Sequence, residues 1–234
     1  MTRALFHDRA DAGKALAAEV KLELEGEPSW GKALVLAIPR GGVPIGRDVA
    51  AALVADLDLV VPRKLGAEGN REYALGAVMS DGTTYLNPEA LGITGATPEY
   101  IEAEKRIEMS EAARRLEAYR GGRQEPTISG RTVIVVDDGI ATGATMVAAL
   151  RWVRSRAARL AVVAAPVAPP STVMELRREA DRVVCPNTPG SFYAIGAFYA
   201  IGAFYESFGQ VSDEEVKEIL TEYWKRSAKD ARVK

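Results

Sequence analysis

The stretch VIVVDDGIATGATM (residues 133–146) decides the fold class, because it places two acidic residues where a buried strand should end. Its first four residues form a continuous apolar run, which is typical of a strand covered on both faces. Asp137 and Asp138 follow, and they cannot both point into the core because successive strand residues face opposite sides of a sheet. A loop of small residues comes next, with two threonines, two glycines and no lysine, and leads into a predicted helix.

The residues after this strand have the chemistry to bind a sugar phosphate. Ionised Asp137 and Asp138 accept hydrogen bonds without donating any, so their natural partners are hydroxyl groups or a metal ion. The free amides and the dipole of the following helix favour an anion, and glycine lets the backbone approach it closely. Carboxylates that can bind two sugar hydroxyls, next to amides that can bind a phosphate, predict a site for ribose 5-phosphate. The alternative is a plain strand-to-helix turn with two solvated aspartates.

Three other kinds of site do not fit this stretch. A P-loop requires GxxxxGK[ST], and this loop has neither the lysine nor the length. The dinucleotide fingerprint GxGxxG occurs nowhere in the chain. The acidic pair of a receiver domain would follow the first strand, whereas this pair follows about 130 residues of chain.

Strand and helix patterns alternate along the rest of the chain. Predicted strands cover residues 32–39, 56–62, 132–137, 159–168 and 181–186, and predicted helices cover residues 8–25, 44–53, 97–119, 144–155 and 171–180, with a last helix that opens at Ser212 in a capping box. A further hairpin is predicted from ALGAVM (74–79) and TTYL (83–86). The alternation predicts an α/β fold, a mostly parallel twisted sheet with helices on both faces. Ligands of such sheets bind at the carboxyl ends of the strands.

Composition limits the possible functions. With 234 residues, 47% of them hydrophobic, the chain is expected to form a single domain, residues 1–234. A net charge of -2 gives no basic field, so a nucleic-acid partner is not expected. The apolar runs are too short for a membrane span, and the first twenty residues lack the apolar core of a signal peptide. With one cysteine and no leader pattern, we expect a cytoplasmic protein.

VIVVDDGIATGAT resembles the phosphoribosyl pyrophosphate (PRPP) motif of the type I phosphoribosyltransferases, and most of all a bacterial group of undefined substrate. The resemblance implies transfer of ribose 5-phosphate from PRPP to a nitrogenous base, with release of pyrophosphate. Asp137 and Asp138 would bind the ribose hydroxyls, and Mg²⁺ would arrive with PRPP and meet these acids only indirectly. The 5-phosphate would be held by the loop residues Gly139, Ala141, Thr142, Gly143, Ala144 and Thr145.

Two further segments resemble catalytic parts of this family. IPRGG (38–42) is similar to the pyrophosphate loop, which makes Arg40, Gly41 and Gly42 binding candidates and Arg40–Gly41 the expected cis peptide. Arg63-Lys64 resembles the basic element that contacts pyrophosphate, with Lys64 and Arg40 as catalytic candidates. Residues 65–96 match the family's flexible catalytic loop, in which Arg71 and Glu72 are further catalytic candidates; alone, such charges are usually solvated surface residues.

The base is suggested by weaker features. Relatives acting on 6-oxopurines carry an aspartate where this chain has Ala141, so the motif resembles the adenine type, and Glu72 is the candidate for handling the proton of a purine-like base. A hood segment, residues 186–211, repeats FYAIGA and offers Tyr193, Tyr199 and Tyr205 for stacking on the base. The alternative is a core strand with a duplicated unit.

Two other functions are compatible with the same residues. One is a ligand-sensing regulator without catalysis, and the other is a sugar-phosphate hydrolase. Retention of Lys64, both aspartates and a glycine-rich loop favours catalysis. The resemblance also implies a homodimer.

Overall fold

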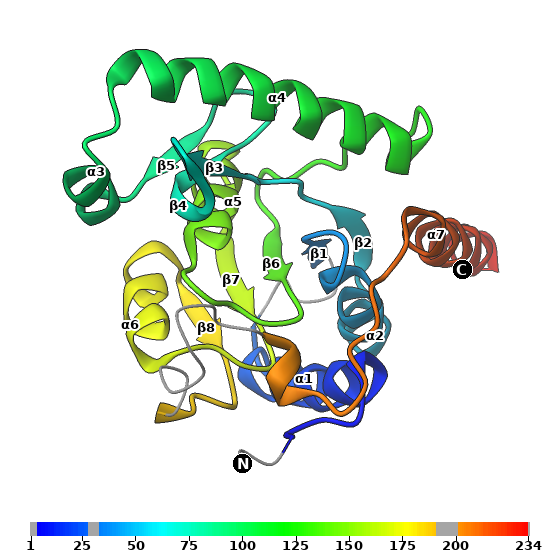
Figure 1. The fold of residues 1–234 in the computed structure, drawn as a ribbon. Coiled ribbons are helices and arrows are strands. Elements are labelled where there is room, and N and C mark those ends of the chain that lie inside the picture. The colour runs from blue at the N-terminus through cyan, green and yellow to red at the C-terminus, as the bar shows by residue number, and fades with distance from the viewer. Residues whose placement is uncertain (1–3, 28–32, 191–200, 234) are drawn as a thin grey trace.

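The computed structural model describes residues 4–27, 33–190 and 201–233 and contains a central parallel sheet (Figure 1). The sheet has five strands in the order β2-β1-β6-β7-β8, and every neighbouring pair is parallel. The strands are β1 (Leu34–Ala37), β2 (Asp56–Leu59), β6 (Thr132–Val136), β7 (Leu160–Ala164) and β8 (Arg182–Val184). The predicted parallel α/β sheet is therefore confirmed.

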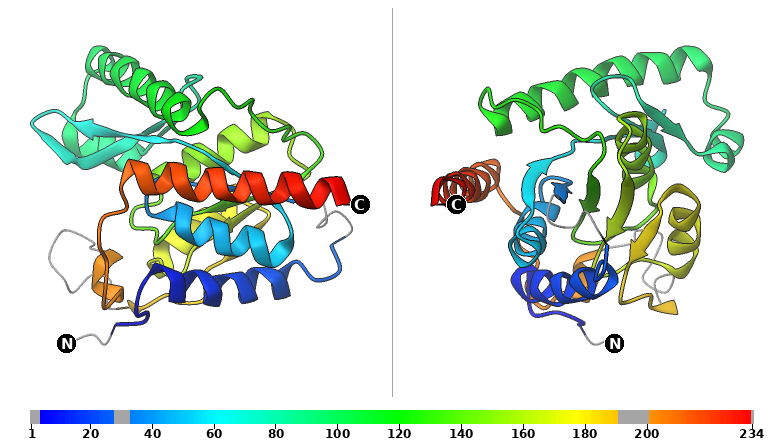
Figure 2. Two further views of the ribbon diagram at one scale, coloured as in Figure 1. Left: turned by 90° about the vertical axis from the view of Figure 1, so that its right-hand side faces the viewer. Right: turned by 180° about the vertical axis from the view of Figure 1, so that it is seen from behind.

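Helices cover both faces of the sheet, as the apolar strands require (Figure 2). In β1, Val35 and Ala37 face one layer while Leu34 and Leu36 face the other, which is the two-residue alternation of a strand. The first layer comprises α1 (Arg9–Glu23), α2 (Gly42–Leu53) and α7 (Asp213–Val233), and the second comprises α5 (Ala144–Ser155) and α6 (Pro170–Glu179).

A three-stranded antiparallel sheet with two helices stands beside the parallel sheet, and we call residues 63–120 the hairpin arm. Its elements are β3 (Arg63–Ala67), β4 (Asn70–Val78), β5 (Thr84–Leu86), α3 (Pro88–Thr94) and α4 (Pro98–Arg120). The predicted hairpin is confirmed as β4 pairing with β5. The sequence patterns do not predict α3. Arg63 and Lys64, expected in the loop that follows a strand, instead lie in β3, where they pair with Val78 and Ala77 of β4.

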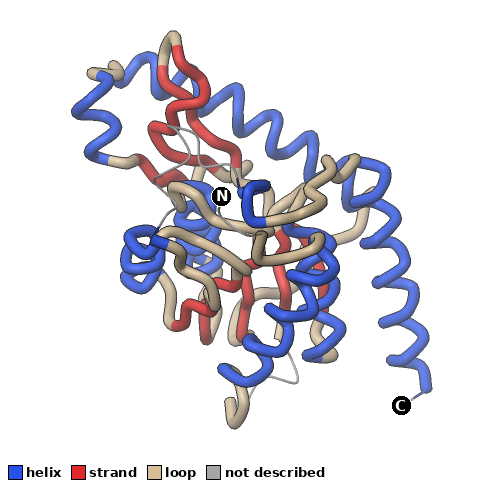
Figure 3. Tube along the Cα trace, turned by 60° about the horizontal axis from the view of Figure 1, so that its bottom comes forward, coloured by secondary structure: helices blue, strands red, loops and turns tan. Residues whose placement is uncertain are grey.

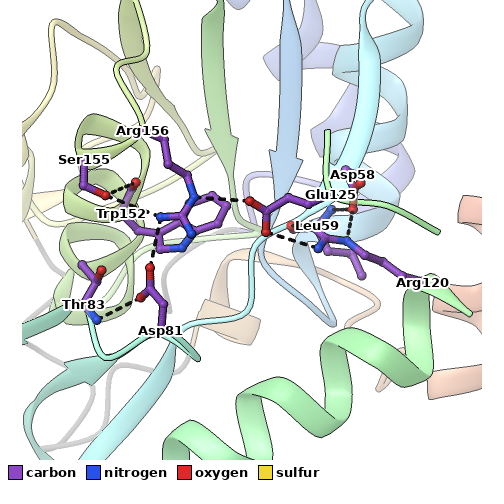
Figure 4. A network of polar contacts seen from close by, with 9 residues as sticks. All are labelled: Asp58, Leu59, Asp81, Thr83, Arg120, Glu125, Trp152, Ser155 and Arg156. Atoms are coloured by element: carbon purple, nitrogen blue, oxygen red, sulfur yellow. Dashed lines mark hydrogen bonds and ion pairs between the residues drawn. The ribbon is translucent and has the colours of Figure 1, made fainter. Parts of the chain in front are cut away.

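A chain of ion pairs connects the hairpin arm to the core (Figure 4). Arg120, the last residue of α4, donates from Nε to Asp58 Oδ1 of β2 at 3.0 Å, and its guanidinium also contacts Glu125. Glu125 in turn contacts Arg156 at the end of α5, and Arg156 donates to Asp81 in the β4–β5 turn at 3.0 Å. The arm is thus attached to the core through both its hairpin and its long helix.

A segment near the start of the chain pairs with residues 204–207, which precede the last helix α7. The amides of Leu5 and Phe6 donate to the Phe204 carbonyl, and the amides of Glu206 and Ser207 donate to the carbonyls of Phe6 and His7. Seen from the end drawn in Figure 3, loop segments lie over the strand ends. None of the described helices is both long enough and apolar enough to cross a bilayer.

Candidate active site

Asp137 and Asp138 lie where β6 ends. Asp137 stays in register with β7, because its amide donates to the Ala164 carbonyl at 3.3 Å. The Asp138 amide donates to Asp137 Oδ1 at 2.8 Å, so the first carboxylate fixes the turn that begins at the second. Both residues lie at the carboxyl edge of the sheet, and the Asp138 side chain is only 14% exposed.

The IPRGG loop contacts these acids directly. Because β1 and β6 are neighbouring parallel strands, the loops that follow them start side by side. A Cβ atom on Gly41 would collide with the Asp138 carboxylate, and one on Gly42 would lie 2.7 Å from the Val136 carbonyl oxygen. The fold thus brings together two motifs about 95 residues apart, and both glycines are required by the close approach.

The cis peptide of this loop differs from the prediction by one position. It lies between Pro39 and Arg40, whereas the sequence led us to expect it between Arg40 and Gly41. Residue type does not reveal a cis bond unless proline follows it, so only the structure could decide its place.

The small-residue loop leads into α5 as predicted. Gly143 precedes the helix with φ +79°, a conformation that favours glycine, and its carbonyl accepts from the Val147 amide at 2.9 Å. The Thr172 hydroxyl of α6 donates to the Ala141 carbonyl at 2.7 Å and so supports the loop from outside. Thr142 is exposed and Thr145 half-buried. The first amides of α5 therefore have the arrangement that suits an anion.

Arg9, which the sequence did not indicate as a site residue, forms an ion pair with Asp138. Arg9 Nε donates to Asp138 Oδ2 at 2.8 Å, and both side chains are largely buried. Burial raises the pKa of Asp137 well above its usual value, and the neighbouring charge of Asp138 raises it further. Burial also raises the pKa of Asp138, although Arg9 opposes that change. No pattern around Arg9 in the sequence indicates this contact.

Arg40 contacts a polar pair contributed by two distant helices. Its guanidinium lies 3.6 Å from Asp213, the first residue of α7, and Asp213 Oδ1 accepts from the Tyr119 hydroxyl of α4 at 2.7 Å. Burial, together with Asp213, raises the pKa of Tyr119 to about 12. Tyr119 therefore remains a hydrogen-bond donor across the neutral range.

The basic residues of β3 face opposite sides of the hairpin. Arg63 pairs across the strands with Val78 and donates to Glu108 of α4 at 2.8 Å. Lys64 pairs with Ala77, whose side chain packs on Ala144 and Ala148 of α5. Directly opposed residues share a face, so Lys64 lies on the side of the hairpin that faces the start of α5.

The structure brings Lys64 and Glu72 together but directs Arg71 elsewhere. Lys64 Nζ lies 3.1 Å from Glu72 Oε2, and this pair is exposed. Arg71 donates from Nη2 to both oxygens of Glu104, a buried carboxylate on α4, at 3.1 and 2.9 Å. Two of the three charged candidates of the hairpin are therefore neighbours, and the third contacts the long helix.

Of the three hood tyrosines, only Tyr205 is among the described residues. Its hydroxyl donates to the Asp138 carbonyl at 2.6 Å, and its ring lies between Phe6 and Phe208 with centroid separations of 5.5 and 4.8 Å. At 5% exposure it supports the acidic turn and offers no open face for stacking on a base. Tyr193 and Tyr199 lie outside the described part of the chain.

The described residues contain no group of three His, Cys, Asp or Glu side chains able to hold a metal ion. Asp137 and Asp138 form a pair whose second member already contacts Arg9. Such a pair fits an ion that brings most of its oxygen ligands with the substrate.

Comparison with known proteins identifies the family. Residues 4–199 match the family described as phosphoribosyl transferase domain. Rv0571c of Mycobacterium tuberculosis H37Rv, provisionally named a phosphoribosyl transferase, is 40% identical over 216 residues, which are 92% of this chain and 46% of that protein. The chain thus spans about half the length of the curated relatives it matches.

Solved structures agree with this match. TT1426 from Thermus thermophilus is 41% identical, with a TM-score of 0.73 over 93% of this chain and 98% of that one. AQ2163 from Aquifex aeolicus has 12% identity and a TM-score of 0.50 over 77% of this chain and 74% of its own, a similarity of fold alone. The chain belongs to the phosphoribosyltransferase family.

Proposed function

We propose that this protein transfers ribose 5-phosphate from PRPP to a nitrogenous base and releases pyrophosphate. The observation that carries the proposal is the contact between the IPRGG loop and the two acids, where Gly41 touches Asp138 and Gly42 touches the end of β6. A diol-binding pair and a loop of backbone amides are thereby adjacent, as a ribose with a leaving group at C1 requires. Neither motif alone would support this function.

Each group has a separate task in the proposed reaction. Asp137 and Asp138 accept hydrogen bonds from the ribose hydroxyls, and the first turn of α5 binds the 5-phosphate. Arg40 and Lys64 donate to the pyrophosphate as the C1–O bond breaks and negative charge moves onto it. The base nitrogen then bonds to C1 from the opposite side and gives up its proton. Mg²⁺, when bound with PRPP, supplies further positive charge on the pyrophosphate oxygens.

The hairpin arm is the proposed cover of the reacting centre. Its strands β3 and β4 carry Lys64 and Glu72, whose side chains lie 3.1 Å apart, while β4 packs along α5. Excluding water protects the positively charged ribose ring from hydrolysis. We propose Glu72 as the group that accepts the proton of a purine-like base, supported by its 3.1 Å contact with Lys64 at the proposed pyrophosphate end.

The assembly and the compartment are also proposals. Ile107 of α4 is 56% exposed and Ile93 of α3 is 68% exposed, so the hairpin arm carries apolar surface suited to a second copy of the chain. We propose a cytoplasmic homodimer. Light scattering across a concentration series would test the dimer, which a constant monomer mass would refute.

The decisive experiment measures pyrophosphate release from PRPP and Mg²⁺ across a panel of purine and pyrimidine bases. Release is expected only with an accepting base. Asp137→Asn should lower kcat/KM for PRPP roughly ten- to a hundredfold, the loss of a charged hydrogen bond of about 1.5–3 kcal/mol. Asp56→Asn, at the amino end of β2, is the matched control.

Two results would refute this function in favour of the alternatives. Release without any base would indicate a hydrolase acting on the sugar phosphate. No release with any base, together with RNA affinity that falls steeply with salt, would indicate a regulator. The same assays on a longer protein would show whether further chain changes the outcome.

A further inference from the structure

Arg9 is held in place by three partners near the turn formed by Asp137 and Asp138. Its Nε donates to Asp138 Oδ2 at 2.8 Å, its Nη1 donates to the Gly209 carbonyl at 2.6 Å, and its guanidinium lies 3.8 Å from the centroid of the Phe208 ring. The side chain is only 13% exposed. A guanidinium with a charge partner, a carbonyl and an aromatic face is fixed in one orientation.

The segments that carry Arg9 and its partners form one unit, which we call the terminal clasp (residues 5–9 and 204–209). Four backbone hydrogen bonds join its halves. From one half, Arg9 contacts the side chain of Asp138; from the other, the Tyr205 hydroxyl contacts the Asp138 carbonyl at 2.6 Å. The clasp therefore holds Asp138 by its backbone and its carboxylate at the same time.

The remaining side of Asp138 faces the IPRGG loop. Gly41 touches the carboxylate closely enough that no side chain fits between them. Arg9 donates to Oδ2, the same oxygen that the Gly41 Cβ position approaches most closely. The orientation of the carboxylate is thus set by contacts on Oδ2.

We propose that Arg9 is a positioning residue, which fixes Asp138 so that its carboxylate meets a ribose hydroxyl. The inference rests on the proposed function for the identity of the sugar. It adds Arg9, which lies 129 residues before Asp138, to the residues that shape the binding site. Arg9 does not touch the ligand. It acts through Asp138 alone, and this distinguishes it from a residue that merely stabilises the fold.

The test is a double-mutant cycle on the affinity for ribose 5-phosphate, measured by calorimetry. Arg9→Met should weaken binding roughly 10- to 100-fold, the range expected for a charged hydrogen bond lost to the ligand. Asp138→Asn should weaken it similarly, and Arg9→Met should then add little because both changes remove the same contact. Arg47→Met, an arginine of α2 paired with Asp48, is the matched control and should bind as the wild type does.

Arg9→Lys keeps the charge but cannot reach Asp138, Gly209 and Phe208 together, so an intermediate loss is expected. It also serves as the test if Arg9→Met does not fold, which thermal unfolding would reveal. Additive losses in the cycle, or wild-type affinity in Arg9→Lys and Arg9→Met, would overturn the inference, as would a wild type that does not bind ribose 5-phosphate.

Failure of this inference differs from failure of the proposed function. Binding with a non-additive cycle but no pyrophosphate release would overturn the reaction and leave the role of Arg9 standing. Base-dependent release of pyrophosphate together with an additive cycle would support the reaction and overturn the role of Arg9.

Discussion

Replacing Gly41 with alanine tests the central contact of the site. The backbone of Gly41 has φ -62° and ψ -31°, which alanine adopts without strain, so the substitution acts only through its added Cβ. That Cβ would collide with the Asp138 carboxylate, with Oδ1 of the same group also within 3.1 Å. Either the carboxylate must rotate away from Arg9 or the loop must move.

The expected loss of stability follows from these two possible rearrangements. Rotation of Asp138 gives up a charged hydrogen bond, about 1.5–3 kcal/mol, and movement of the loop costs about 1–3 kcal/mol, the usual range for overpacking. Because the chain needs only one of them, the free energy of unfolding should fall by about 1–3 kcal/mol. At about 2–4 °C per kcal/mol for a chain of this size, Tm should fall by roughly 2–12 °C. Affinity for ribose 5-phosphate should fall roughly 10- to 100-fold, since Asp138 loses its position.

The assay pairs thermal unfolding with calorimetric binding of ribose 5-phosphate. Gly92→Ala is the control, because its Cβ would point into open space in α3 and alanine favours a helix by about 0.5–1 kcal/mol. The control should therefore be slightly more stable and bind normally. A Gly41→Ala protein with unchanged Tm and unchanged affinity would show that the IPRGG loop and Asp138 are not in contact.

Three further predictions concern other parts of the chain. Lys64→Ala should cut pyrophosphate release at least a hundredfold, about 3–4 kcal/mol in the barrier, with unchanged circular dichroism; near-normal turnover would contradict its assignment. Arg120→Met should cost about 3–5 kcal/mol in urea unfolding, because it leaves buried Asp58 unpaired. Burial already raises the pKa of Asp58, so the loss should be largest at high pH and shrink as pH falls and the carboxyl takes up a proton; a pH-independent loss would refute this. Burial raises the pKa of Cys185 to about 12, so a thiol reagent at pH 8 should react with it slowly until urea unfolds the chain.

Several local features were predictable because they depend on neighbours in the sequence. The helix of residues 144–155 matches α5, and Thr97 caps α4 by accepting from the Tyr100 amide at 3.2 Å. The Ser212 hydroxyl likewise accepts from the Glu215 amide at 3.0 Å. Apolar periodicity and capping groups act within one turn or one strand, so the pattern of residues is enough to reveal them.

Contacts between distant segments were not predictable in the same way. Arg63 and Lys64 are adjacent in sequence, yet the first contacts α4 and the second faces α5, because strand pairing sets the face of each. Arg71 reaches Glu104, which nothing in the hairpin sequence indicates. Tyr205 supports the acidic turn although its aromatic repeat suggested a base-stacking role.

The sequence by itself determined the alternation of strands and helices, the acids that end β6 and the loop that precedes α5, because each is a local pattern of polarity and size. Only the tertiary structure decided which groups surround Asp138. Gly41 and Tyr205 approach it from distant parts of the chain, and Arg9 does so from a third element. Their approach depends on the strand order and on the pairing of residues 5–7 with residues 204–207. Burial then makes the electrostatic contacts of Asp138 stronger than the same contacts would be on an exposed surface.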